Sequence, residues 1–527
     1  MKARYFFLAA ALFAAGQLLA QETYQNAKVT IEDLNGTARY VGTGGALDAL
    51  GAEISTAGTN PAGIGLFRRG KVEATVGVVS QQDAAEYNHG NATNVSFDQA
   101  GFVWSNRTGE TSFVNLAFNY HKSRNFDYIL SADAAFGATT PEGNTVYASQ
   151  NKLSYMKLIN GYMYQLDPEG FPMWNRELSS CNQLDDLYEK NVLYASGEEF
   201  PYFYEAQSYD FDRAHKGYIG EYDLNISGNI NDRVYLGLTV GLHDVHYKHI
   251  GDYTEKIFPN EENINKLNVY DERKITGVGA DVKAGILFRP ISYMPLIIGA
   301  SISSPIYYDL KTSNYTELSD GRNTSWASDE YKYKIYTPWK FGLNAGYTDG
   351  RYFALGATYE YSDYGSILTR VDDDGSYYIY DYYESSHNDK DMNYHTENTL
   401  KGVSTIKLGA EVKPIPELAL RCGYNYVSPA YNKLGFKDGS IQSNGSYVSS
   451  ATDFTNWKAT NRFTLGLGYR LGKTNIDVAY QYSNTKGDFY PFMSYEDVEF
   501  YSFDNIAKAV EVSNKRHQVV CTIGYAF

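Results

Sequence analysis

The C-terminal segment, residues 516–527 (RHQVVCTIGYAF), has an alternating pattern that constrains the fold more than any other part of the chain. Every second position from residue 519 to the end carries an apolar or aromatic side chain. Because successive side chains of a β-strand point to opposite faces, these side chains share one face. A terminal strand with one continuous apolar face predicts contact with lipid. The residues of that face are Val519, Cys521, Ile523, Tyr525 and Phe527.

The N-terminus predicts export. Lys2 and Arg4 precede an apolar run at residues 5–15, and Ala20 offers a small residue for cleavage before Gln21. This order is that of a secretory signal peptide, so residues 1–20 are expected to be removed. A final strand that ends on an aromatic residue resembles the C-terminal strand of Gram-negative outer-membrane β-barrels. We therefore expect the protein in the outer membrane, in contact with its lipid and as a monomer.

The composition favours a barrel over a bundle of membrane helices. No later stretch reaches the roughly 18–20 uninterrupted apolar residues of a transmembrane helix, and the mean hydropathy is -0.43. Only alternate residues of a barrel strand meet lipid, so an average conceals the spanning segments. Tyrosine supplies 50 and phenylalanine 26 of the 527 residues, which favours many strands with aromatic girdles at both membrane interfaces.

The charge and the cysteines exclude several classes of protein. A formal charge of -16 argues against a nucleic-acid partner, and much of the excess acid falls in segments such as 371–391. The run Asp372-Asp373-Asp374-Gly375 could bind calcium, but it lacks the spacing of an EF-hand, so we favour a charged surface loop without a metal. Too few cysteines are present for a disulfide framework, and no structural disulfide is expected among Cys181, Cys422 and Cys521.

Period-two alternation predicts an all-β fold, a 14-stranded antiparallel transmembrane β-barrel at residues 71–527. Connections after even-numbered strands are short and those after odd-numbered strands are long, the longest being about 122–216. This asymmetry is typical of outer-membrane barrels with periplasmic turns, external loops and both termini periplasmic. The predicted strands lie near residues 71–80, 95–105, 111–121, 217–227, 233–247, 275–288, 295–308, 332–347, 351–367, 402–413, 417–428, 460–471, 474–486 and 515–527.

Charged residues share the inward phase of these strands. A basic side chain at the lipid midplane would cost roughly 2–4 kcal/mol, so the shared phase supports the register. Because both signs are present, we expect a network between the wall and a plug. The residues are Glu221, Asp223, Asp281, Lys283, Glu360, Lys407, Glu411, Arg421 and Asp477.

Residues 21–70 do not read as strands. This segment is rich in glycine and small residues and predicts short helical turns around Ala46–Leu50 with irregular backbone elsewhere. Irregular backbone cannot face lipid, whereas the lumen of a barrel offers partners for its free N–H and C=O groups. We therefore predict a luminal plug, or hatch.

The tetrapeptide Asn60-Pro61-Ala62-Gly63, placed just before the first strand, resembles the hatch motif of the FadL/TodX family. Members of that family are outer-membrane transporters of long-chain fatty acids and other hydrophobic compounds. The resemblance covers almost the whole chain. Residues 337–340 (TPWK), 359–364 (YEYSDY) and Arg289-Pro290 are similar to a branch often labelled haemin receptors.

The Asn60-Pro61 step suits a hatch on physical grounds. Proline fixes its own φ, biases Asn60 towards an extended conformation and has no N–H to satisfy, while the Asn side chain can close a turn. The alternative is an ordinary turn that leads into the first strand. With the family resemblance, we favour the hatch.

The longest predicted loop, about 122–216, is rich in aromatic and methionine residues. In the transporters that the chain resembles, external loops form an apolar landing groove, and flexible Met with rigid aromatic side chains suits such capture. Packing over the barrel mouth explains the same composition, and both interpretations remain open. The candidates for the groove are Met156, Tyr162, Tyr164, Phe171, Met173, Trp174, Phe200 and Phe203.

Neither a catalytic set nor a metal site emerges. His243, His246 and His249 cannot share one ion on a regular strand, because His246 points away from the others and these lie roughly 20 Å apart. We interpret them as solvated or interfacial. The chain has no G-x-S-x-G motif or aligned Ser and His pair, so no enzyme and no cofactor are expected.

The resemblance implies passive uptake of a hydrophobic small molecule, such as a long-chain fatty acid or a similar amphiphile. Two alternatives remain. The barrel could be a structural scaffold of a secretion or surface-assembly system, whose mark would be a sealed hatch. It could also bind or take up haemin.

Overall fold

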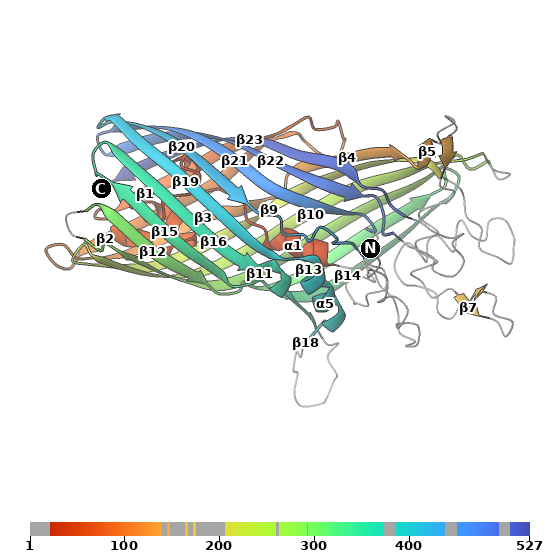
Figure 1. The fold of residues 1–527 in the computed structure, drawn as a ribbon, viewed down its shortest axis with the longest axis horizontal. Coiled ribbons are helices and arrows are strands. Elements are labelled where there is room, and N and C mark those ends of the chain that lie inside the picture. Colours follow the sequence, from red (N-terminus) through yellow and green to blue (C-terminus); the bar gives the residue numbers. More distant parts are fainter. Residues whose placement is uncertain are drawn as a thin grey trace, which may run out of the picture.

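The computed structural model is a closed antiparallel β-barrel (Figure 1). Fourteen strands form its wall, as predicted. Strand β1 (Lys71–Gln82) closes the wall by pairing with β23 (Val510–Ala526), and the N–H of Phe527 continues the ladder by donating to the carbonyl of Gly70 at 3.1 Å. The structure describes residues 22–139, 145–147, 164–166, 172–174, 206–259, 263–291, 294–372, 386–437, 451–494 and 506–527. The predicted signal peptide lies outside them.

Most wall strands are single elements. They are β1, β2 (Thr93–Arg107), β9 (Ala206–Ile230), β10 (Val234–Ile257), β11 (Lys266–Phe288), β19 (Gly402–Ile415), β20 (Leu418–Val427), β21 (Phe454–Leu471), β22 (Thr474–Tyr490) and β23. The others are interrupted once and form pairs: β3 (Phe113–Asn125) with β4 (Tyr128–Ala135), β12 (Leu296–Ser303) with β13 (Tyr307–Ser319), β14 (Thr324–Tyr336) with β15 (Lys340–Thr348), and β16 (Phe353–Asp363) with β17 (Leu368–Asp372).

The interruptions explain where three predicted strands differ from the observed ones. The predicted strands 295–308 and 332–347 are each broken at a proline, Pro305 and Pro338, which has no N–H to donate to a ladder. The two breaks are neighbours, because the N–H of Thr337 donates to the carbonyl of Ile306 at 3.1 Å. In the third, 351–367, a 3-10 turn, η5 (Tyr364–Ser366), separates β16 from β17.

The outer face of the wall is apolar. On β21 the outward residues Phe463, Leu465 and Leu467 are 56%, 61% and 49% exposed, whereas the intervening Thr464 is buried. The C-terminal strand has the predicted face, with exposed Val519, Ile523, Tyr525 and Phe527 and with Cys521 partly exposed. Cys422 is exposed on the same outer surface, and neither cysteine forms a disulfide. None of the helices in the described part of the chain has both the length and the apolar character needed to cross a bilayer.

The N-terminal segment fills the lumen (Figure 1, red). Its elements are α1 (Thr23–Thr30), α2 (Ala38–Gly42) and two 3-10 turns, η1 (Ile54–Gly58) and η2 (Pro61–Leu66). Most of its residues are buried, and α2 and η2 contact the inner faces of wall strands. The predicted luminal hatch is therefore present. Its helices lie elsewhere than predicted, because residues 46–50 form only a turn at 48–50.

The first described residues of the hatch do not lie beside the C-terminus. Phe527 lies at the short-turn end of the barrel, while α1 lies towards the long-loop end (Figure 1). There the hydroxyl of Thr23 meets α5 (Lys390–Thr399), 2.9 Å from His395 Nδ1. The even strand count correctly predicted that Lys71 lies beside Ala526. The hatch, however, runs through the lumen before β1 begins.

The predicted loop 122–216 is shorter than expected. Strand β3 continues to Asn125, β4 follows it, and β9 begins at Ala206, so both flanks of the loop extend the wall. Short strand pairs lie between them: β5 (Gly137–Thr139) with β6 (Thr145–Tyr147), and β7 (Tyr164–Leu166) with β8 (Pro172–Trp174). On the opposite side of the barrel mouth, β18 (Ser386–Asn388) pairs with β17.

Candidate functional site

The hatch turns sharply at Asn60 and Pro61, and hydrogen bonds fix this corner to the wall. Asn60 is extended, with φ -122° and ψ 99°, and its Oδ1 accepts from the N–H of Ala62 at 3.1 Å. Its Nδ2 donates to Asn344 Oδ1 at 2.7 Å. On the other side, Ser227 Oγ donates to the carbonyl of Pro61 at 2.8 Å. Both the extended conformation and the closed turn agree with the prediction.

The wall has glycines where the corner approaches it most closely. A Cβ atom at Gly237 on β10 would lie 2.3 Å from the carbonyl carbon of Pro61. One at Gly285 on β11 would lie 2.0 Å from Asn60 Oδ1. Any larger residue would force the backbone of the hatch away from the wall.

A buried carboxylate ties the middle of the hatch to the adjacent wall. Asp48 accepts hydrogen bonds from Thr59 Oγ1 at 2.5 Å, Thr358 Oγ1 at 3.0 Å and Asn344 Nδ2 at 3.2 Å. Burial raises the pKa of Asp48 above its ordinary value. Asn344 therefore joins both Asp48 and the Asn60 corner to β15.

The predicted network of luminal charges is present and includes the hatch. Arg39 lies 3.2 Å from Glu411, which also accepts from Arg421 Nε at 2.7 Å, and Arg421 donates in turn to Asp477 at 2.6 Å. On another part of the wall, Lys407 lies 2.6 Å from Glu360. The wall residues of these pairs all point into the lumen, as the alternation along the strands predicted.

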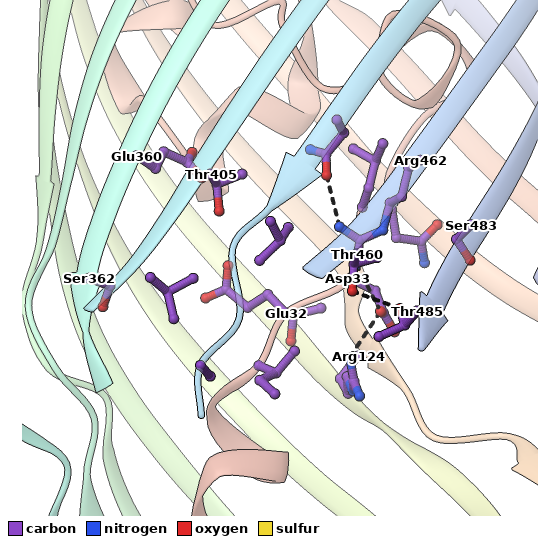
Figure 2. Close-up of a pocket in the computed structure, with 18 of the residues that line it drawn as sticks. Glu32, Asp33, Arg124, Glu360, Ser362, Thr405, Thr460, Arg462, Ser483 and Thr485 are labelled. Carbon is purple, nitrogen blue, oxygen red and sulfur yellow. Dashed lines mark hydrogen bonds and ion pairs between the residues drawn. The ribbon is translucent and has the colours of Figure 1, made fainter. Parts of the chain in front are cut away.

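A cavity of about 190 Å³ lies between hatch residues 28–35 and the wall (Figure 2). Asp33 projects into its charged side, where Arg124 lies 3.0 Å, Arg462 3.5 Å and Arg516 3.7 Å away. Burial alone would raise the pKa of Asp33, but the three guanidinium groups outweigh it and lower that pKa below its ordinary value. Beside it, Glu32 is held by Lys340 at 2.5 Å.

The remaining lining is amphiphilic. Hydroxyl, aromatic and aliphatic side chains all contribute to it, so a ligand would meet both hydrogen-bond partners and apolar contacts. The cavity is smaller than the roughly 300–1,000 Å³ typical of pockets for small molecules. Its uncharged lining includes Ile31, Leu34, Tyr128, Tyr361, Ser362, Tyr364, Val403, Thr405, Tyr431, Trp457, Thr460, Ser483 and Thr485.

The cavity lies beside a change in strand pairing. Pairing between β20 and β21 ends at Val427 and Thr460, and β21 has a bulge between Trp457 and Thr460 where it pairs with β22. All three residues line the cavity, as does Lys458 within the bulge. This is the part of the wall where the hatch, the cavity and irregular backbone meet.

Comparison with known proteins gave structural matches only. No protein-family model and no curated protein sequence matches the chain. The chain is similar in structure to FadL and TodX. A FadL homologue from Pseudomonas aeruginosa has a TM-score of 0.47 and 11% identity, with 94% of this chain and 100% of that chain covered. The toluene transporters TodX of Pseudomonas putida and TbuX of Ralstonia pickettii both have TM-scores of 0.46, at 10% and 11% identity, with 94% of this chain and 99% of theirs covered. At such values the similarity says nothing of the ligand.

The residues predicted for a ligand groove are mostly outside the described part of the chain. Met156, Tyr162, Phe171, Phe200 and Phe203 lie there. The backbone of the other three is in short strands, Tyr164 in β7 and Met173 and Trp174 in β8. The groove therefore stays a prediction.

The interpretation of the histidines was wrong for two of them. His243 and His249 are buried in the lumen, 3.1 Å from Asp281 and 2.5 Å from Asp271. Only His246 points outward, 46% exposed, as its phase predicted. These two side chains are not solvated, because the hatch covers the inner face of β10.

The charged centre of the cavity was missed from the sequence. Arg462 and Arg516 share the inward phase of Thr464 and Gln518, so the alternation could have indicated them. Arg124 lies beyond a register shift between Lys122 and Arg124. Asp33 lies in the irregular hatch, where no periodic pattern exists.

Proposed function

We propose that the protein is an outer-membrane channel for the passive uptake of a hydrophobic small molecule with a polar head group, such as a long-chain fatty acid. The observation that carries this proposal is the cavity between the hatch and the wall. Its lining combines arginine and lysine side chains with aromatic and aliphatic ones. An arginine side chain can bind the carboxylate of a ligand through two parallel hydrogen bonds, while apolar contacts desolvate its hydrocarbon chain.

The position of the cavity supports movement through the wall or past the hatch. An apolar solute has no favourable path through the lipopolysaccharide leaflet, whereas a protein surface that desolvates it in steps lowers the barrier without ATP. In the proposed path the ligand binds first at the external loop between β4 and β9 and then reaches the cavity. The Asn60–Gly63 corner then moves aside and lets the ligand reach the short-turn end.

Uptake of a labelled fatty acid in a Gram-negative host that lacks its own fatty-acid channel tests this function. The wild-type protein should restore uptake. Replacing Asn60-Pro61 with Gly-Gly, or deleting the apolar part of the loop between β4 and β9, should reduce uptake several-fold while the barrel remains folded. Wild-type protein that reaches the membrane folded but restores no uptake would contradict the proposal.

A structural scaffold is the second candidate, and the fixation of the hatch favours it. Asp48, Arg39 and the Asn60 corner each bind the wall, and the cavity is small for a fatty acid. Loss of a secreted or surface protein in a deletion strain, with unchanged uptake of fatty acid and haem, would support the scaffold. Haemin uptake has less support, because His243 and His249 are both buried against carboxylates.

A further inference from the structure

Six ionisable side chains form one cluster between the hatch and the wall. Glu221 and Asp223 come from β9, Asp281 and Lys283 from β11, His121 from β3 and His243 from β10. Their side chains are at most 5% exposed, except that of His121, which is 14% exposed. The proposed transport function assigns no role to this cluster, although His121 and Glu221 also line the cavity.

The lysine neutralises only part of the cluster. Lys283 Nζ lies 2.5 Å from Glu221 Oε1, 3.0 Å from Asp223 Oδ1 and 3.3 Å from Asp281 Oδ2. Three carboxylates therefore share one ammonium group, which can compensate only one negative charge. Buried charges without counter-charges are strongly unfavourable, so this arrangement calls for a further cation.

The second oxygen of each β9 carboxylate faces imidazole nitrogens. His121 Nε2 lies 3.5 Å from Glu221 Oε2, and His121 Nδ1 lies 3.6 Å from Asp223 Oδ2. His243 Nδ1 lies 3.9 Å from the same Glu221 Oε2. Within the described part of the chain, Asp223 Oδ2 and His243 Nδ1 are buried and have no hydrogen-bond partner.

The N···O distances of 3.5–3.9 Å are long for hydrogen bonds, and one ligand atom each from His121, Glu221 and Asp223 lie within 4.8 Å of one another. A hydrogen bond from N–H to oxygen spans about 2.7–3.2 Å. Two donors bound to one ion at about 2.0–2.2 Å with tetrahedral angles lie about 3.4 Å apart, so these side chains would draw together slightly around a bound ion. In addition, Asp281 Oδ1 lies 3.1 Å from His243 Nε2. A carboxylate in that position keeps the proton on Nε2 and leaves the Nδ1 lone pair for a metal.

We propose that Glu221, Asp223 and His121, with His243 as a fourth donor, bind a divalent transition-metal cation such as Zn²⁺. Two imidazoles and two carboxylates are suitable zinc ligands, and a divalent cation adds positive charge to this acidic cluster. The cation can arrive from the cavity, because His121 and Glu221 line it. Gly58 of the hatch covers the site closely, since a Cβ atom there would lie 3.0 Å from His121 Cε1 and 3.2 Å from Asp223 Oδ2. The ion would thus join three wall strands beneath the hatch.

Metal content and cobalt spectra of the purified full-length protein test this site. The protein should carry an affinity tag without histidine and be treated with a chelator before reloading with Zn²⁺ or Co²⁺. We expect one equivalent of bound metal and tetrahedral Co²⁺ absorption bands without a sulfur charge-transfer band. The double variant His121→Gln/His243→Gln should lose at least nine-tenths of the bound metal.

Matched variants separate this site from other sources of binding. His246→Gln removes an outward histidine of the same strand and should bind metal like the wild type. A variant with all three cysteines changed to serine should do the same. Heat-modifiable mobility on gels shows that each barrel is folded. A folded wild-type protein that binds less than one-tenth equivalent, or equal binding by the double variant, would overturn the proposal, as would nitrogen NMR shifts showing both histidines protonated in metal-saturated buffer.

Discussion

Asp33 of the hatch lies 3.0 Å from Arg124 of the wall, at the point where two more arginines, Arg462 and Arg516, also face it. One carboxylate therefore holds three guanidinium groups around the cavity. Repulsion among the arginines is relieved only while the hatch is docked. This makes Asp33 the residue whose loss should most affect the seating of α1 and the segment after it.

Replacing Asp33 with Asn should loosen the hatch without unfolding the barrel. Removal of charge-assisted hydrogen bonds costs about 1.5–3 kcal/mol, so cleavage of residues 22–70 by a protease added to purified protein should accelerate roughly 10-fold or more. Glu32→Gln, which removes the exposed neighbouring ion pair, is the control and should have a smaller effect. Equal protection in Asp33→Asn and the wild type would show that the hatch does not depend on this cluster.

Low pH should have the same effect as that substitution. The arginines lower the pKa of Asp33 in the docked hatch below its ordinary value of 3.8. Its stabilising contribution is therefore complete above that value and is lost as the pH falls through the lower, folded pKa. Hydrogen exchange of residues 22–70 should increase in acid in the wild type, and the increase should be smaller in Asp33→Asn.

Docking of the hatch should also depend on pH through Lys28, in a higher pH range than through Asp33. Burial, with a smaller effect of Arg213, lowers the pKa of Lys28 to about 7 from 10.5. Below pH 7 the docked and released forms both carry the proton, and the cost of burying the charge is complete. Between about pH 7 and 10.5 the docked form loses its proton more readily, so docking becomes more favourable as the pH rises. Protease protection of α1 should rise from pH 6 to 9 in the wild type and stay flat in Lys28→Met.

Gly237→Ala should displace the Asn60–Pro61 corner. The added Cβ atom would lie 2.3 Å from the backbone of Pro61, and overpacking of this kind costs typically 1–3 kcal/mol. Gly228→Ala on the adjacent strand is the matched control, because nothing lies within 4 Å of a Cβ atom there. Protease sensitivity of the hatch and the unfolding temperature of the barrel, measured together, should change in Gly237→Ala alone.

Leu465→Arg should destabilise the barrel from the lipid side. Leu465 is 61% exposed on the outer face of β21, and arginine at the bilayer midplane costs about 2–4 kcal/mol. Leu471→Arg, next to the tight turn before β22, should cost about 0–1 kcal/mol. Urea titrations in lipid vesicles measure both values, and an equal loss in both variants would contradict the predicted orientation of β21.

The strands of the wall could be predicted because lipid-facing and lumen-facing side chains alternate along them at every second position. Val519, Leu465 and Glu411 all follow from alternation, since lipid and lumen select different side chains at every second position. The prolines at 305 and 338 were visible too, but the pattern on either side of each continued, so the breaks were not predicted.

The hatch and its cavity could not be predicted to the same degree. Helix α1 is short and contains threonine, asparagine and valine, so packing rather than propensity stabilises it. Tyr24 stacks on Tyr431 with ring centroids 5.2 Å apart, a contact between residues far apart in the sequence. Asp33 and Arg516 come together only when the barrel closes, so no local sequence pattern predicts their contact.

The seam between β1 and β23 has a consequence for assembly. The pairing of Lys71 with Ala526 closes the wall around residues 22–67, and their first helix lies towards the long-loop end. In a completed cylinder, α1 could be threaded in from the short-turn end only if the bonds of Asp48 and Asn60 to the wall were broken. We therefore expect the wall to close around a hatch that is already in place, with the pairing of β1 and β23 as the closing step.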